Sequence, residues 1–148
     1  MKHSIFIFLF CTTISFAQTI DYNTKKGFAA NGYDVVAYFN NRAIEGDKKI
    51  TTTLNDIIYK FSSEENLKAF NNNPKKYMPQ YGGYCAYAVA LKSSKVSINP
   101  ETFLIENGKL YLFYDAWGTN TLKLWQKENE KLLIEKADKN WEQIKFKK

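Results

Sequence analysis

The first 17 residues place the strongest constraint on this chain, because they hold its only histidine and one of its two cysteines. They read MKHSIFIFLFCTTISFA, with a lysine near the start, an apolar run from Ile5 to Phe16, and small side chains at Ser15 and Ala17. This pattern is typical of a secretory signal peptide cut near Ala17. The run is shorter than the about 20 apolar residues of a membrane-spanning helix, so we expect no membrane span after cleavage.

Cleavage there would leave residues 18–148 with no histidine and with Cys85 as the lone thiol. An intrachain disulfide would then be impossible, although exported proteins fold where disulfides can form. Ser-His-Asp and Cys-His catalysis would be excluded, together with every metal site that uses histidine. We therefore predict an exported protein, periplasmic or extracellular (secreted), that is not an enzyme.

Composition and charge indicate one globular domain rather than a nucleic-acid binder. An apolar content of 45% is enough for a core of its own in a chain of this length. Without Lys2 the chain has 20 basic and 15 acidic side chains, a net charge of +5, and Arg42 is its only arginine. Because nucleic-acid readers rely on arginine, and because the lysines alternate with acids over residues 123–148, we expect a solvated lysine surface and no nucleic-acid partner.

Local patterns predict an α+β domain over residues 32–148, preceded by a polar lead-in at residues 18–31. β-branched and aromatic residues predict strands at residues 35–39, 50–53 and 57–61. Ser62 and Glu65 form a capping-box pattern, which predicts a helix that runs to about residue 72. Pro74 ends that helix, and a short helix is expected over residues 84–90.

The C-terminal third predicts a hairpin followed by helix. Asn107-Gly108 separates two apolar runs, residues 103–106 and 109–114, and Asn-Gly in that setting is a strong hairpin signal. Farther along, apolar side chains recur on one helical stripe, at Leu133, Ala137, Trp141 and Ile144. We expect that stripe to pack against the rest of the domain.

Three segments of this chain resemble the YHS domain family, in its exported branch with a Gly-Gly-Tyr-Cys-Ala element. They are Gly32–Phe39, Tyr59–Phe70 with Pro74 and Tyr77, and Pro79–Ala86. The resemblance extends over residues 30 to 145 and implies a small antiparallel sheet, a treble-clef-like strand–helix unit and C-terminal helices.

Relatives of that type are small metal modules with cysteine ligands, and the matching positions here hold Ala37, Ser62 and Asn66. A structural zinc site needs about four Cys or His ligands, so the resemblance implies the fold of such a module without its metal site. Ser62 is expected to keep a local role by capping the helix through its hydroxyl.

Cys85 is the first candidate for a binding residue. Met78, Tyr81 and Cys85 fall at i, i+3 and i+7, which on a helix would bring a thioether, a phenol and a thiol together. Soft sulfur ligands favour Cu(I), and the resemblance to metal-handling relatives makes a metal ion such as copper the leading ligand, with these three residues as its expected site. Two alternatives stay open: a redox-active thiol that forms mixed disulfides, and a buried, inert cysteine in a structural or protein-binding module.

Two further features have both a functional and a structural interpretation. The tyrosines near Cys85 could line a ligand pocket or fill the core with their hydroxyls bonded to backbone; they are Tyr77, Tyr81, Tyr84 and Tyr87. Asp34 could serve as an oxygen ligand or a general base, or it could bond backbone N–H groups in a turn.

Overall fold

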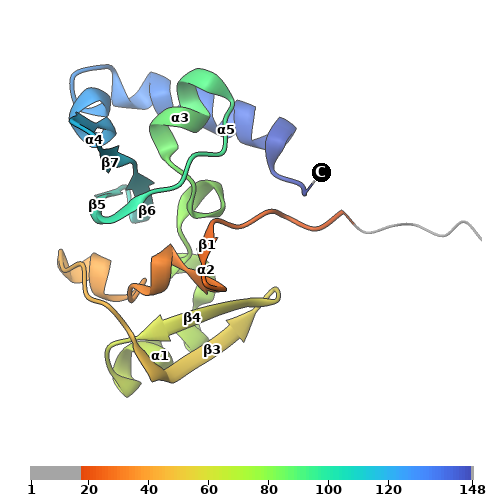
Figure 1. Ribbon diagram of the computed structural model, residues 1–148, viewed down its shortest axis with the longest axis vertical. Helices are drawn as coiled ribbons and strands as arrows, with labels where there is room; N and C mark the ends of the chain where they lie inside the picture. The colour runs from red at the N-terminus through yellow and green to blue at the C-terminus, as the bar shows by residue number, and fades with distance from the viewer. Residues whose placement is uncertain (1–17, 148) are drawn as a thin grey trace, which may run out of the picture.

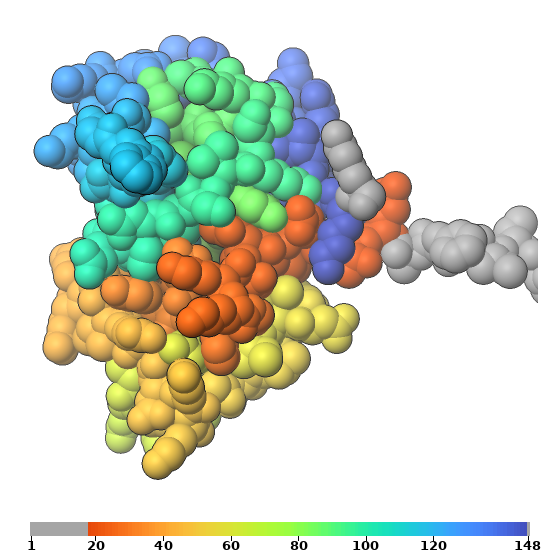
Figure 2. Space-filling view, viewed as in Figure 1, coloured from red at the N-terminus to blue at the C-terminus, as the bar shows by residue number. Residues whose placement is uncertain are grey.

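The computed structural model describes residues 18–147 and combines helices with small sheets, so the predicted α+β class is confirmed. The predicted signal peptide lies outside the described residues. The chain forms two halves (Figure 1), one around the β3–β4 hairpin and one around the C-terminal helices. In the space-filling view the N-terminal residues, in red and orange, lie where the halves meet (Figure 2).

The first half is a four-stranded sheet in the order β1-β2-β4-β3. β3 (Asp47–Leu54) and β4 (Ile57–Phe61) pair antiparallel, which confirms both predicted strands. The short strands β1 (Thr24–Lys25) and β2 (Phe28–Ala29) come from the expected lead-in, followed by the 3-10 turn η1 (Ala30–Gly32). Because β2 pairs with β4 in parallel, the sheet is mixed rather than purely antiparallel.

Residues 35–39 do not form the predicted strand. Asp34 accepts hydrogen bonds from the backbone N–H groups of Val36 and Ala37, at 2.9 and 3.2 Å, and the chain turns into the 3-10 helix η2 (Ala37–Asn40). Val35 and Tyr38 are fully buried in that conformation. The prediction was wrong because β propensity reflects packing on a pleated surface, and these apolar side chains are buried from a turn instead.

Helix α1 (Glu64–Asn72) follows β4 and confirms the predicted strand–helix unit. Its N-cap is Ser63, whose hydroxyl accepts the N–H of Asn66 at 3.1 Å. The capping role predicted for Ser62 is therefore wrong, since the hydroxyl of Ser62 donates to Asp34. Phe70 points from α1 into the core, and α2 (Pro74–Tyr77) begins at the proline that ends the helix.

The second half begins with η3 (Gln80–Gly83) and α3 (Ala86–Lys92). The predicted hairpin is confirmed as β5 (Asn99–Glu106) and β6 (Lys109–Phe113), and the smaller hairpin of β7 (Asp115–Ala116) and β8 (Thr119–Asn120) follows it. α4 (Thr121–Trp125) and α5 (Glu130–Ile144) complete the chain, and the predicted stripe of α5 faces the core.

Strand β6 lies between two hydrophobic cores. Leu110 and Leu112 belong to the core under the first sheet, whereas Tyr111 and Phe113 belong to the core under α3 and α5. Successive side chains of a strand point to opposite faces, so a strand buried on both faces has an unbroken apolar sequence. All four residues are almost fully buried, and β6 therefore joins the two halves.

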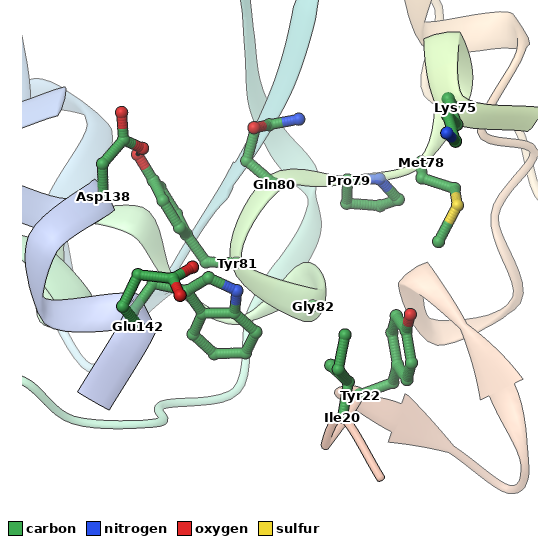
Figure 3. Close-up of a pocket in the computed structure, with 11 residues that line it drawn as sticks. Ile20, Tyr22, Lys75, Met78, Pro79, Gln80, Tyr81, Gly82, Asp138 and Glu142 are labelled. Carbon is green, nitrogen blue, oxygen red and sulfur yellow. Dashed lines mark hydrogen bonds between the residues drawn. The ribbon is translucent and has the colours of Figure 1, made fainter. Parts of the chain in front are cut away.

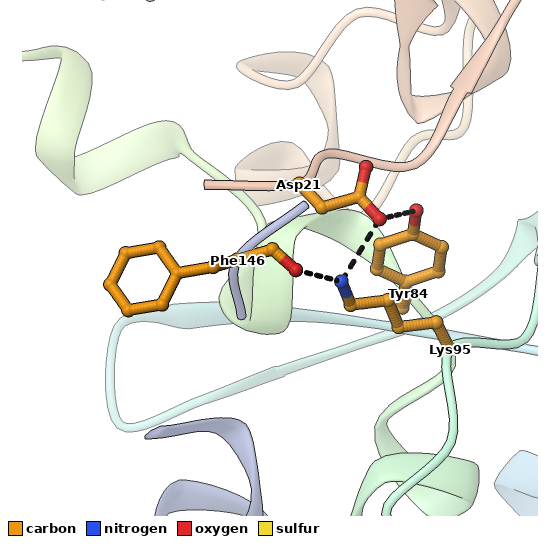
Figure 4. A network of polar contacts seen from close by, with 4 residues as sticks. All are labelled: Asp21, Tyr84, Lys95 and Phe146. Carbon is orange, nitrogen blue, oxygen red and sulfur yellow. Dashed lines mark hydrogen bonds and ion pairs between the residues drawn. The ribbon is translucent and has the colours of Figure 1, made fainter. Parts of the chain in front are cut away.

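The two ends of the described chain are fastened together. The side chain of Lys95 bonds Asp21 and the backbone oxygen of Phe146, both at 2.9 Å, and Tyr84 donates to Asp21 at 3.0 Å (Figure 4). Backbone pairing of Ile20 with Phe146 continues the contact. No helix within residues 18–147 has the length and apolar character that crossing a membrane requires.

Candidate functional site

Met78, Tyr81 and Cys85 do not come together as one site. Their spacing assumed a continuous helix, but Pro79 precedes η3, where Tyr81 and Gly82 have φ of 53° and 60°. This left-handed backbone redirects the chain, and residues 79 and 85 bridge to Leu110 and Leu112 of β6. Met78 and Tyr81 consequently line one cavity, and Cys85 lines another.

The cavity of Met78 and Tyr81 lies between η3 and α5 and has a volume of about 440 Å³. Figure 3 shows Tyr81 directed toward Asp138 and Met78 on the other side, beside Tyr22. The Tyr81 hydroxyl donates to the Asp138 carboxylate at 2.9 Å. Burial, reinforced by this carboxylate, raises the pKa of Tyr81 far above its usual value, so the phenol keeps its proton. A protonated phenol that already donates is a poor metal ligand.

The cavity beside Cys85 is smaller, about 240 Å³, and mostly apolar. Cys85 is fully buried at the N-cap of α3, and its side chain forms part of the wall. Ala88, Val96 and Leu124 contribute apolar surface, and Thr119 and Thr121 contribute hydroxyls from the β8–α4 junction. Lys92, an exposed residue in the last turn of α3, supplies the cavity's charged group.

Cys85 belongs to a short chain of hydrogen bonds that includes Thr121 and Tyr114. The sulfur is 3.3 Å from the hydroxyl oxygen of Thr121, and that hydroxyl is 2.8 Å from the backbone oxygen of Tyr114. A threonine hydroxyl has one proton, and here it goes to the carbonyl. The Cys85 S–H is therefore the group placed to donate to Thr121. Because reactive cysteines lie in partly exposed sites, a fully buried sulfur in this position is poorly placed for attack on disulfides.

This geometry does not fit the copper site expected at Cys85, Met78 and Tyr81. The thiol and the thioether belong to different cavities, and both the thiol and the phenol donate to oxygen acceptors. Within residues 18–147, no cluster of three or more His, Cys, Asp or Glu side chains could hold a metal ion.

Asp34 is buried and saturated with donors. Its Oδ1 accepts the N–H groups of Val36 and Ala37, and its Oδ2 accepts the N–H and hydroxyl of Ser62 and the amide of Asn66, each at 2.7 Å. Ala37, Ser62 and Asn66 are the three positions matched above to metal-binding cysteines, so one carboxylate and its donors bring them together. Asp34 therefore organises structure and has no free lone pair directed at a ligand.

Of the four tyrosines near Cys85, Tyr77 packs against the first core, Tyr81 and Tyr84 belong to the second, and Tyr87 packs against both. Tyr81 is buried, Tyr84 donates to Asp21, and Tyr87 donates to Glu128 at 2.7 Å. Burial and the Asp21 hydrogen bond raise the pKa of Tyr84 to about 12. These hydroxyls bond carboxylates rather than backbone, which differs from the structural interpretation, and only Tyr87 of the three lines the cavity of Cys85.

Sequence reasoning missed Lys60, which was grouped with the solvated lysines. Its side chain is only 4% exposed, and its ammonium lies 3.1 Å from the Glu45 carboxylate, at the edge of a cavity of about 540 Å³. Lysine is almost never this buried. The sequence did offer one signal: this lysine stands inside the apolar strand sequence Ile-Ile-Tyr-Lys-Phe, where its neighbours favour burial.

Comparisons with known protein families, with curated proteins and with solved structures found no match to this chain. The YHS resemblance therefore stays a prediction.

Proposed function

We propose that this protein is an exported, non-enzymatic binding domain that takes a small, mostly apolar molecule into the cavity beside Cys85. The observation that carries this proposal is the cavity itself: a mostly apolar space of about 240 Å³ whose lining also includes two threonines and a lysine. Apolar pockets with a few convergent polar groups are the usual form of small-molecule sites.

The volume sets the size of the ligand. An apolar cavity of about 150 Å³ is enough to hold benzene, so the Cys85 cavity has room for one ring with a short substituent. The hydroxyl of Thr119 can donate to or accept from a polar substituent, and Lys92 favours one with negative charge. A small aromatic alcohol or acid meets these requirements.

The redox alternative has less support. Cys85 is fully buried and hydrogen-bonded to Thr121, whereas redox-active cysteines are accessible to solvent. We expect a bulky thiol reagent to label the native protein at least about tenfold more slowly than the unfolded protein. Labelling of the native protein at the unfolded rate would favour the redox function over this proposal.

Binding can be tested by following the methyl signals of Ala88, Val96 and Leu124 by NMR while the purified protein is titrated with phenol and with toluene. We expect saturable shifts confined to the cavity walls. Ala88→Leu should fill the space and abolish the shifts of Val96 and Leu124, whereas Leu91→Ala, an exposed change on the same helix, should leave binding intact.

Two outcomes would remove the proposal. One is the absence of saturable shifts with either probe in the folded protein. The other is equal binding by the Ala88→Leu variant, checked to be folded by its thermal transition. If that variant does not fold, protection of Cys85 decides the matter, because a bound ligand should slow labelling as its concentration rises.

A further inference from the structure

We propose a second binding site, separate from the Cys85 cavity, in which Lys60 and three neighbouring lysines hold the phosphoryl group of a small organic phosphate. The site is the cavity of about 540 Å³ between β1, β2 and the start of β5. It shares no lining residue with the Cys85 cavity, so it stands or falls independently of the function proposed above.

The fold makes room for Lys60. A Cβ atom on Gly32 would lie 2.6 Å from Cε and 3.0 Å from Nζ of Lys60, and one on Gly46 would lie 2.5 Å from its Cβ. Gly32 also has a φ of +88°, which side-chain-bearing residues rarely adopt. Gly32 and Gly46 thus lie against the Lys60 side chain at positions where a larger residue would displace it. With both glycines in place, Lys60 lines the cavity.

The ammonium of Lys60 has donors to spare. It has three N–H donors, and within residues 18–147 its hydrogen-bond partner is Glu45, while the ring of Phe28 lies 4.9 Å away. Glu45 is 68% exposed, so its carboxylate can move into solvent at little cost. A buried charge is expensive unless it is fully paired, and an anion in the cavity would complete the pairing.

The charges around the cavity indicate how many negative charges the ligand carries. The lining holds four lysines, namely Lys25, Lys26, Lys48 and Lys60, against two acids, Glu45 and Glu101. Four positive charges less two negative ones leave a net charge of +2, which a dianion neutralises. A phosphate monoester is close to a dianion at neutral pH, because its second pKa is about 6.

Two further features favour an organic phosphate over a carboxylate or the free ion. A carboxylate carries one negative charge and would leave half of the lining's net charge of +2 unneutralised, whereas a phosphate monoester carries close to two negative charges. The cavity is also far larger than one phosphoryl group and includes Phe28, Tyr33 and Pro100, which offer apolar surface to the rest of the molecule.

Calorimetric titration in a phosphate-free buffer tests the site, with phenyl phosphate, inorganic phosphate and benzoate as probes. We expect phenyl phosphate to bind, and Lys60→Met to weaken it by about tenfold or more, since a hydrogen bond to a charged group is worth that much. Lys48→Met should weaken it about two- to fivefold. Lys109→Met, at an exposed position on β6 outside the cavity, should leave the affinity unchanged.

Glu45→Gln gives the sharpest contrast. If Glu45 competes with the ligand for Lys60, its neutralisation should strengthen phosphate binding several-fold, whereas a purely structural ion pair would lose stability with no gain in affinity. This variant and Lys48→Met keep the test valid if Lys60→Met fails to fold. If inorganic phosphate bound as tightly as phenyl phosphate, the phosphoryl group alone would account for binding and the organic part of the ligand would contribute nothing.

Three results would overturn the proposal. They are benzoate binding more tightly than both phosphates, unchanged binding in a folded Lys60→Met variant, and no difference between Glu45→Gln and the original protein.

Discussion

Replacing Asp34 with asparagine should destabilise the protein strongly without changing its shape. The carboxylate accepts five hydrogen bonds, two on Oδ1 and three on Oδ2. An asparagine has one acceptor oxygen, so its NH₂ group must face one of the two donor sets. The smaller loss keeps the oxygen toward Ser62 and Asn66 and leaves the N–H of Val36 without its acceptor, whereas the N–H of Ala37 keeps its 3.2 Å bond to the backbone oxygen of Asp34.

The size of the effect follows from this one unsatisfied donor and from the loss of the negative charge. Leaving a buried donor unsatisfied costs about 1–3 kcal/mol, and the remaining bonds lose their charge assistance. We therefore expect Asp34→Asn to lower the free energy of unfolding by about 3 kcal/mol, a large share of the about 5–15 kcal/mol that stabilises a typical domain.

Urea unfolding followed by tryptophan fluorescence measures this change, with an m value that should stay constant. Asp47→Asn is the matched control: Asp47 is exposed and accepts one N–H, from Lys49 at 2.8 Å, so its replacement should change stability by less than about 0.5 kcal/mol. If Asp34→Asn cost no more than this control, the carboxylate would not organise the turn and the strand–helix unit as argued.

Three further predictions come from the same structure. Gly32→Ala should cost about 1–3 kcal/mol in urea unfolding because of its positive φ, and it should weaken phosphate binding because its Cβ would press on the end of Lys60; unchanged affinity would show that the glycine does not shape the site. Trp117→Asn should stabilise by up to about 1 kcal/mol, because Trp117 is 96% exposed at φ 53°, a turn position that suits asparagine; a loss of stability in thermal unfolding would contradict this. Burial raises the pKa of both Tyr84 and Tyr111 from about 10 to about 12. The stability that these two neutral phenols give the folded protein is therefore fully present below pH 10 and is lost as the pH rises through 12. Tyrosinate absorbance during alkaline unfolding measures this, and ionisation of all tyrosines before unfolding would refute it.

The sequence by itself was enough for elements whose signals lie within a few consecutive residues. Asn107 and Gly108 both adopt the left-handed backbone that a tight hairpin needs, with φ of 50° and 71°. The apolar stripe of α5 faces the core, and its helical spacing can be read from the α5 sequence alone. The N-cap of α1 was predicted to within one residue, at Ser62 instead of Ser63. Both serines precede the helix, and either hydroxyl could accept a free N–H of its first turn.

Tertiary structure alone determined the features that depend on partners distant in sequence. Residues 35–39 have strand propensity, yet Asp34 turns them away from a sheet because its carboxylate also binds Ser62 and Asn66. The same limit applies to the candidate sites: Cys85 was recognised as the lone thiol, but its donation to Thr121 and its separation from Met78 required the fold. Lys60 could be seen as a lysine in an apolar strand, whereas its burial between two glycines depends on chain segments that only folding brings together. Periodicity records which face of an element is apolar, and it contains no information about which distant group that face meets.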